Sequence, residues 1–242
     1  MALHFLVESS TDTRVGDLVS LTGAEAKHAA VVRRLRVGEA VTVGDGAGVW
    51  LEGTAEEVSP TRVDVRVSER TEQAALRPRV VLVQALAKGD RDELAVQAAC
   101  ELGVDEIVPW QAARSVSRWE GPKAVKGRER WATIVREAAK QAHRAWLPEV
   151  AAPVTTKQLA RRAASDRVLL LDPTAPAKLS EIVPDGRDLV LVVGPEGGIS
   201  DEELRLLTDA GAERVLLGDT VLRTSTAGPA AIAVLSVALG RW

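Results

Sequence analysis

The pattern of apolar and polar residues changes character near residue 72 of this 242-residue chain. Before that point the apolar stretches are short, and in Val63–Val67 every second residue is valine. A period of two is typical of half-buried strands, and the glycine-rich stretch 44–48 between two apolar runs predicts a hairpin turn. We therefore expect a small β-rich domain over residues 1–72, with one short helix from about Ala24 to Arg34.

The polar stretch Glu69–Pro78 ends in a proline and is typical of a linker. Beyond it, apolar runs alternate with helical patterns, which predicts an α/β domain over residues 73–242, built on a mostly parallel sheet with helices on both faces. The expected strands are Arg79–Ala87, Val104–Val108 (closed by Pro109), Arg167–Leu171, Leu189–Val193 and Arg214–Leu217, and the expected helices are Asp90–Leu102, Lys123–Ala145, Lys157–Ala164 and Thr226–Leu239.

Two C-terminal segments carry most of the candidate chemistry. Residues 194–200 read GPEGGIS, and residues 217–227 read LGDTVLRTSTA. Each follows an apolar run and precedes a predicted helix, which is where open α/β sheets place ligand loops. Small side chains in the first segment let backbone N–H and C=O groups approach a bound molecule. Ser200 and Glu203 form a capping-box pattern for the next helix, which Gly211 ends.

Composition excludes several classes of protein. Hydrophobic residues at 46% and charged residues at 27% are typical of a globular chain, and no stretch is apolar for long enough to span a membrane. The N-terminal residues lack a secretory pattern, and the single Cys100 cannot form an internal disulfide, so we expect a cytoplasmic protein. Three scattered histidines and one cysteine cannot build a usual zinc site, so we expect no metal.

Basic residues gather in two places although the net charge is −3. Between Arg114 and Arg144 nine basic residues face three acidic ones, and a second cluster combines Lys27, Arg33, Arg34 and Arg36 with His28. Either cluster alone is explained equally well by a solvated surface or by phosphate contacts. Two clusters in an acidic protein favour RNA binding.

The order of these motifs resembles the RsmE family of SPOUT-class methyltransferases, which methylate N3 of a uridine in 16S ribosomal RNA. The resemblance rests on both C-terminal segments, on Lys88–Glu93 followed by Glu101–Val104, and on His28 with residues 32–38. It implies an N-terminal PUA-like RNA-binding barrel and a C-terminal SPOUT domain with a trefoil knot. It also implies S-adenosylmethionine as cofactor, a homodimer, and small-subunit ribosomal RNA or the 30S subunit as partner.

The resemblance also implies site residues. Those matching the family's methyl-donor site are Leu171, Gly194, Pro195, Glu196, Gly197, Gly198, Leu217, Gly218, Val221, Leu222, Arg223 and Thr224. Without the motif, core packing would explain Leu217, Val221 and Leu222 as well. Candidate RNA-binding residues are His28, Arg33, Arg34, Arg36, Lys88, Arg114, Gln141 and Arg144, of which Gln141 and Arg144 are alternatively dimer contacts.

Methylation of uracil N3 requires removal of a weakly acidic proton and stabilisation of the negative charge that develops on the ring. Arg223 is the candidate for stabilising that charge or for binding the RNA phosphate, with a salt bridge that holds the loop as the structural alternative. Glu196 is a candidate for accepting the N3 proton or for contacting the methyl donor. Its structural alternative is to act as a charge partner for the N-terminus of the next helix. The chain departs from the family at Ser225, where a glutamate is common, and at Arg33 and His143.

Two other functions remain open at this stage. A SPOUT enzyme could act on another base or on the ribose 2′-OH, although the GPEGG loop differs from the usual loop of the ribose enzymes. A binding protein could hold RNA without chemistry, which the intact donor motif disfavours.

Overall fold

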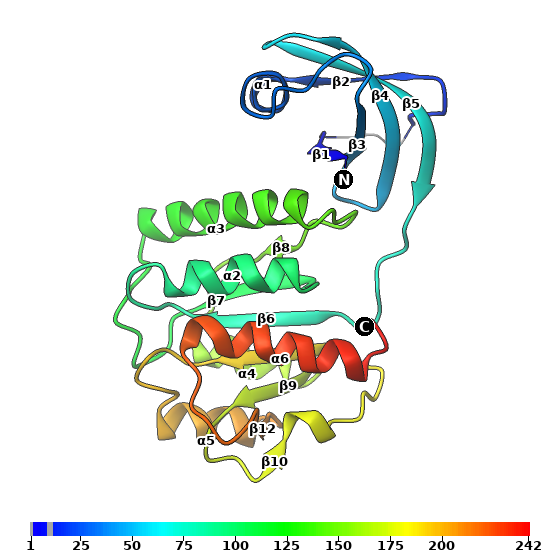
Figure 1. Ribbon diagram of the computed structural model, residues 1–242. Coiled ribbons are helices and arrows are strands. Elements are labelled where there is room, and N and C mark those ends of the chain that lie inside the picture. The colour runs from blue at the N-terminus through cyan, green and yellow to red at the C-terminus, as the bar shows by residue number, and fades with distance from the viewer. Residues whose placement is uncertain (1, 9–11) are drawn as a thin grey trace. The chain divides into compact units, whose positions relative to one another are not determined.

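The computed structural model describes residues 2–8 and 12–242, which form two compact units (Figure 1). Unit 1 comprises Met1–Ala75 and Ala139–Leu147, and unit 2 comprises Leu76–Ala138 and Pro148–Trp242. Of the domain predicted over 1–72, residues 1 and 9–11 lie outside the described residues. Among the described residues, no helix combines the length and the apolar character that crossing a membrane requires.

Unit 1 is built on a five-stranded sheet with the order β1-β3-β4-β5-β2. β1 pairs with β3 in parallel and the other neighbours are antiparallel. A short helix, α1 (Gly23–Lys27), continues into a π-helical turn (His28–Val32), which confirms the predicted helix. The strands are β1 (Leu3–Leu6), β2 (Leu18–Thr22), β3 (Ala40–Gly44), β4 (Val49–Val58) and β5 (Arg62–Glu72).

The predicted linker is wrong at its start, because β5 continues to Glu72. Leu51 and Trp50 of β4 pair with Arg70 and Thr71, so this polar stretch is held by ladder hydrogen bonds rather than by apolar burial. The polar side chains of residues 69–72 therefore do not indicate where the last strand of this sheet ends.

Residues 139–147 belong to unit 1, although a single boundary after residue 72 leaves them out. Gly48 N–H donates to the Ala145 carbonyl (3.0 Å), and Trp146 Nε1 donates to the Gln73 carbonyl (2.7 Å). This bond gives Trp146 a structural role.

Unit 2 contains a seven-stranded sheet in the order β10-β12-β9-β11-β6-β7-β8, in which every neighbouring pair is parallel. The parallel α/β prediction is confirmed; the trefoil knot stays a prediction. The strands are β6 (Val80–Ala85), β7 (Glu106–Trp110), β8 (Glu149–Val150), β9 (Arg167–Leu171), β10 (Ala177–Lys178), β11 (Leu189–Val193) and β12 (Glu213–Leu216). The helices are α2 (Arg91–Glu101), α3 (Pro122–Gln141), α4 (Thr156–Arg162), α5 (Asp201–Asp209) and α6 (Thr224–Ala238), with a 3-10 turn at Leu179–Glu181.

Helices cover both faces of this sheet, as the alternation predicts (Figure 1). Leu159 of α4 and Leu207 of α5 share one buried cluster with valines of β6, β9 and β11. α2 and α6 pack side by side against β6. Gly228 permits this close approach of α6, because a Cβ there would lie 2.9 Å from Leu82 Cδ1.

Most element boundaries differ from the predictions by one or two residues, and three differences have a structural consequence. α3 ends at Gln141 rather than Ala145, and α6 begins at Thr224 rather than Thr226. Pro109 lies inside β7 instead of closing it. A proline lacks a backbone donor, and it is tolerated here because β8 on one side is only two residues long and pairs with Glu106 and Ile107.

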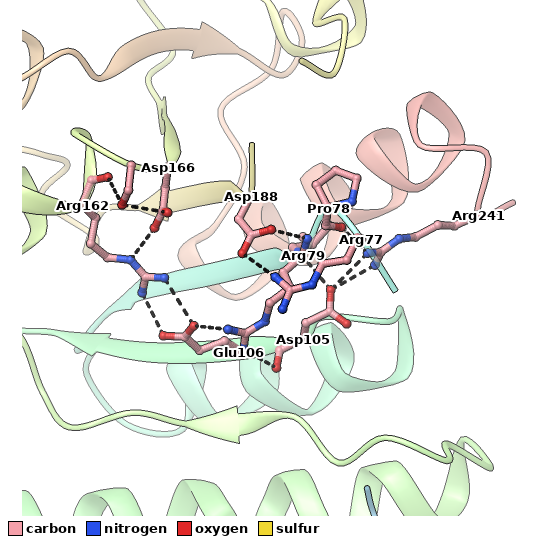
Figure 2. Close-up of polar contacts among 11 residues, drawn as sticks. Arg77, Pro78, Arg79, Asp105, Glu106, Arg162, Asp166, Asp188 and Arg241 are labelled. Carbon is pink, nitrogen blue, oxygen red and sulfur yellow. Dashed lines mark hydrogen bonds and ion pairs between the residues drawn. The ribbon is translucent and has the colours of Figure 1, made fainter. Parts of the chain in front are cut away.

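Ion pairs gather where the parallel strands begin (Figure 2). Asp105, just before β7, accepts from Val80 N–H (2.7 Å) and pairs with Arg241 beyond α6 (3.2 Å). Glu106 pairs with Arg162 (2.8 Å) and Arg79 (3.4 Å). The C-terminal end of the chain is thereby fixed to the amino-terminal edge of the sheet.

Candidate functional site

A cavity of about 660 Å³ lies in unit 2, at the edge where the parallel strands end. Its walls come from the segments after β9 and β11 and from the loop that leads into α6. Such an edge is where open α/β sheets bind ligands. The lining residues are Arg91, Arg114, Leu171, Asp172, Pro173, Thr174, Val193, Gly194, Pro195, Glu196, Gly198, Ile199, Asp201, Leu204, Val221, Leu222, Arg223, Thr224 and Ala227.

The two C-terminal motifs meet at this cavity. Nine predicted donor-binding residues line it, namely Leu171, Gly194, Pro195, Glu196, Gly198, Val221, Leu222, Arg223 and Thr224. Gly197, Leu217 and Gly218 are not among the lining residues, and donor binding by them stays a prediction. Arg91 and Arg114 also line the cavity, yet no local motif predicted either as a pocket residue.

The glycine loop has a backbone shape that larger side chains would disturb. A Cβ on Gly194 would lie 2.9 Å from Ile199 Cγ1 and 3.1 Å from the Ile199 nitrogen. Gly198 has a φ of 71°, in the left-handed region that favours glycine. The capping box of Ser200 and Glu203 is present at the start of α5, as predicted.

Glu203 also fixes the loop after β7. Its carboxylate is buried, and Oε1 accepts from Ala113 N–H (2.8 Å) and from Thr156 Oγ1 (2.9 Å). One carboxylate therefore joins the starts of α4 and α5 to the chain beside the cavity, which a capping pattern in the sequence does not reveal.

Arg114 holds the glycine loop through two hydrogen bonds to its backbone. Its Nη1 donates to the Gly197 carbonyl (3.0 Å) and to the Ile199 carbonyl (3.4 Å). The sequence placed Arg114 in a basic cluster and predicted an RNA contact; that role stays a prediction, while these two bonds show a structural one.

Asp172 brings a charged carboxylate to the cavity wall. Arg214 Nε donates to its Oδ2 (2.6 Å), and Thr174 donates to its Oδ1 through N–H (2.8 Å) and Oγ1 (2.9 Å). Burial alone would raise the pKa of this carboxyl, but the hydrogen bonds from Thr174 and Arg214 outweigh burial and lower the pKa. Asp172 is therefore ionised at neutral pH.

Glu196 is tied to the segment that precedes α2. Its Oε1 accepts from Lys88 N–H (3.0 Å) and from Arg91 Nη1 (2.9 Å). Partial burial raises the pKa of Glu196, but N–H groups of its own residue and of Lys88, with Arg91, lower it below its ordinary value. A carboxylate stabilised in this way is a weak proton acceptor at neutral pH.

Arg223 lies exposed at the cavity rim, immediately before α6. Among the described residues, no side-chain hydrogen bond or ion pair is recorded for its guanidinium, so the salt-bridge alternative finds no support. Its carbonyl accepts from Thr226 and Ala227 N–H groups, which fixes its backbone.

The RNA-binding candidates divide between the two units. Arg33, Arg34 and Arg36 are exposed on one segment of unit 1, where Arg34 has a φ of 55°. His28 is half-buried and lies edge-on to Phe5. Gln141 is exposed and Arg144 half-buried in unit 1, and Lys88 is exposed in unit 2.

The cavity suits a ligand with an apolar face and hydrogen-bonding edges, and its charged lining residues balance, with Arg91, Arg114 and Arg223 against Asp172, Glu196 and Asp201. Leu171, Val221 and Leu222 supply apolar surface, the glycine loop supplies backbone groups, and Asp172 supplies a negative charge. The described residues hold no group of three or more metal-ligating side chains.

Comparison with known proteins places both units in one family. The family profile described as RNA methyltransferase domain matches residues 75–236, and the profile described as RNA methyltransferase PUA domain matches residues 21–68. The ribosomal RNA small subunit methyltransferase E of Mycobacterium bovis is 42% identical over 100% of this chain and 94% of its own length. The protein of the same name from Bacillus subtilis is 32% identical over 98% of this chain and 96% of its own.

Two solved structures share the fold of the whole chain. A ribosomal RNA small subunit methyltransferase E from Neisseria gonorrhoeae, bound to S-adenosyl methionine, superposes with a TM-score of 0.88 at 28% identity and covers 98% of each chain. A methyltransferase from Legionella pneumophila in complex with the same cofactor has a TM-score of 0.84 at 32% identity, over 98% of this chain and 97% of that one. The chain belongs to the RNA methyltransferase family, in the RsmE group of ribosomal RNA small subunit methyltransferases.

Proposed function

We propose that this protein transfers the methyl group of S-adenosylmethionine to N3 of a uridine in small-subunit ribosomal RNA. The observation that carries the proposal is that two separate loop motifs form the walls of one cavity in a chain of this family. S-adenosylmethionine supplies an electrophilic methyl group on a positively charged sulfur. The remaining steps concern how residues of the chain hold this donor and the acceptor base.

Residues of both loops are suited to holding the donor. Leu171, Val221 and Leu222 offer apolar contact to a purine ring, and backbone groups of the glycine loop offer hydrogen bonds to its edge. Rigid placement of the methyl group supplies a large part of the rate of such a transfer.

Arg223 is suited to the acceptor. Its exposed guanidinium at the cavity rim can approach a uracil oxygen and stabilise the charge that develops when N3 loses its proton. For Glu196, the pairing with Arg91 and Lys88 N–H favours a role in anchoring the glycine loop over the role of proton acceptor.

RNA contact by unit 1 rests on Arg33, Arg34 and Arg36. Their exposure on one segment favours phosphate binding, which must weaken as salt concentration rises.

We also infer a homodimer, as family membership implies. Val221 supports it, because this cavity residue is 81% exposed and an apolar side chain at a binding site gains from a partner that covers it. Sedimentation analysis tests the dimer. An enzyme acting on ribosomal RNA is expected in the cytoplasm.

The test is methyl transfer from labelled S-adenosylmethionine to unmethylated small subunits and, separately, to naked small-subunit RNA, followed by mass spectrometry of the nucleosides. N3-methyluridine in either sample supports the proposal. Methyl groups on another base or on ribose would replace uridine N3 as the target, and no transfer to either substrate would overturn the proposal.

A further inference from the structure

Gln84 is a completely buried amide in the middle of the parallel sheet, at the carboxyl end of β6. It does not line the cavity, and none of the motifs includes it. Burying an amide costs free energy unless its polar atoms find partners. Each polar atom of the Gln84 amide is therefore expected to have a hydrogen-bond partner.

The amide starts a chain of hydrogen bonds. Gln84 Nε2 donates to Thr224 Oγ1 (2.9 Å) and to the Ala85 carbonyl (3.1 Å), and Thr224 Oγ1 donates to the Gly194 carbonyl (2.9 Å). The donor and the acceptor of each bond are fixed, because the Gly194 carbonyl can only accept a hydrogen bond. The single hydroxyl proton of Thr224 goes to Gly194, so the Thr224 oxygen must accept its bond from the Gln84 amide.

The second and third members of this hydrogen-bond chain belong to the two loops that form the cavity. Gly194 is the first residue of the glycine loop, and Thr224 is the first residue of α6, directly after Arg223. In the sheet, Gln84 lies opposite Val193, the residue before the glycine loop. The hydrogen bonds therefore join both loops to the rigid strand β6.

The other amide atom shows that this arrangement is not optimal for stability. Gln84 Oε1 is buried and accepts no hydrogen bond from the described residues. An unsatisfied buried acceptor destabilises the fold, and an apolar side chain of similar shape would avoid that cost. What the glutamine provides is a pair of N–H donors, one of which orients Thr224 while the other is held by the Ala85 carbonyl.

We propose that Gln84 is a positioning residue for the methyl donor: through Thr224 it fixes the glycine loop and the loop before α6 relative to each other. The proposal rests on the proposed binding of S-adenosylmethionine in this cavity. Losing the amide frees the Thr224 hydroxyl to rotate. The glycine loop and the loop before α6 then become more mobile relative to each other, although the strands and helices remain folded.

The test is the Gln84→Met variant of the full-length chain, which keeps the length of the side chain and removes its donors. We expect the Kd for S-adenosylmethionine, measured by calorimetry, to rise about tenfold. The KM for the donor should rise with it, while the KM for RNA and the unfolding temperature change little. The matched control is Gln97→Met on the exposed face of α2, where the amide donates to Glu101 one helical turn away.

A double-mutant cycle tests whether Thr224 transmits the effect. Thr224→Val keeps the shape and removes the hydroxyl, so Gln84→Met should add little further loss in its background. Thr224→Ser keeps the hydroxyl and should lose less donor affinity than Thr224→Val. Additive losses in the cycle would overturn the role of Thr224 as the intermediate.

Failure of this inference differs from failure of the proposed function. If the wild-type protein binds the donor and Gln84→Met binds it equally well, the positioning role is wrong and the proposed function stands. If Gln84→Met lowers only the unfolding temperature, the residue is structural and the inference is again overturned. If the wild-type protein binds no S-adenosylmethionine, the proposed function and this inference both fail.

Discussion

The two edges of the parallel sheet in unit 2 use different chemistry. At the edge where the strands begin, charged side chains pair with one another and with backbone groups, as Asp105 does with Arg241 and Val80 N–H (Figure 2). At the edge where they end, glycine-rich loops surround a cavity of about 660 Å³. Ion pairs at this second edge, such as the pair of Glu196 with Arg91, hold the loops around the cavity.

This difference separates what stabilises the fold from what binds a ligand. A paired charge at the first edge fixes the starts of strands and the residues after α6. Small residues at the second edge leave backbone groups accessible, and the loops then depend on a few side chains for their shape. Changes at the two edges should therefore affect different measurements.

The largest effect is expected from Gly194→Ala. The added Cβ would lie 3.1 Å from the Ile199 nitrogen, a backbone atom that cannot move without shifting the glycine loop. We expect methyl transfer under single-turnover conditions to slow about 100-fold, because small displacements of a bound reactant are costly. A rate within about threefold of wild type would show that the loop geometry does not matter.

The opposite edge is tested by Asp105→Ala. The change removes the acceptor for Val80 N–H and leaves the Arg241 guanidinium, which is 11% exposed, without its carboxylate. We expect unit 2 to lose about 2–4 kcal/mol of stability, measured by urea unfolding. The affinity for S-adenosylmethionine should stay unchanged under conditions where the protein is folded. Loss of donor affinity in the folded variant would contradict the separation of the two edges.

Glu196→Gln decides between two roles for one carboxylate at the cavity. If Glu196 anchors the loop, removing its charge weakens the bond to Arg91, and we expect a rise of about threefold in the KM for the donor with kcat nearly unchanged. If it accepts the uracil proton, kcat falls by about 100-fold or more. Steady-state kinetics separate the two results.

The smallest expected effect is the acid sensitivity that Asp172 contributes. Its pKa lies below the ordinary value near 3.8, so the stability from its bonds to Thr174 and Arg214 is fully present above that pH and is lost as the pH falls through the lowered pKa. The difference in unfolding midpoint between wild type and Asp172→Asn should be constant from about pH 6 to about pH 5, by this linkage, and shrink as the pH falls further. A difference that persists unchanged at about pH 2 would assign the effect to another group.

Much of the fold could be predicted from local patterns. β9 and β11 have the predicted bounds, because both are continuous apolar runs between turn signals. β1 and β2 were not predicted, since each is too short to show alternation and is held by partners far along the chain, such as Val41 opposite Leu3. Pairing at a distance is also why residues 139–147 were not assigned to unit 1.

The site was predictable where backbone shape is encoded locally. The loops at Gly194 and Thr224 could be found because each stands between an apolar run and a predicted helix, and both line the cavity. Arg114, Glu203 and Gln84 could not be assigned, because their roles depend on contacts with residues roughly 80 to 140 positions away. A basic residue or a buried amide has no local pattern that names its partner.

The most direct test of the separation between the two edges is a calorimetric titration of S-adenosylmethionine into three folded proteins: wild type, Gly194→Ala and Asp105→Ala. We predict equal affinity for wild type and Asp105→Ala, and affinity at least about 30-fold weaker for Gly194→Ala. This prediction would be contradicted if the wild-type protein bound no donor, or if Gly194→Ala bound it as tightly as the other two.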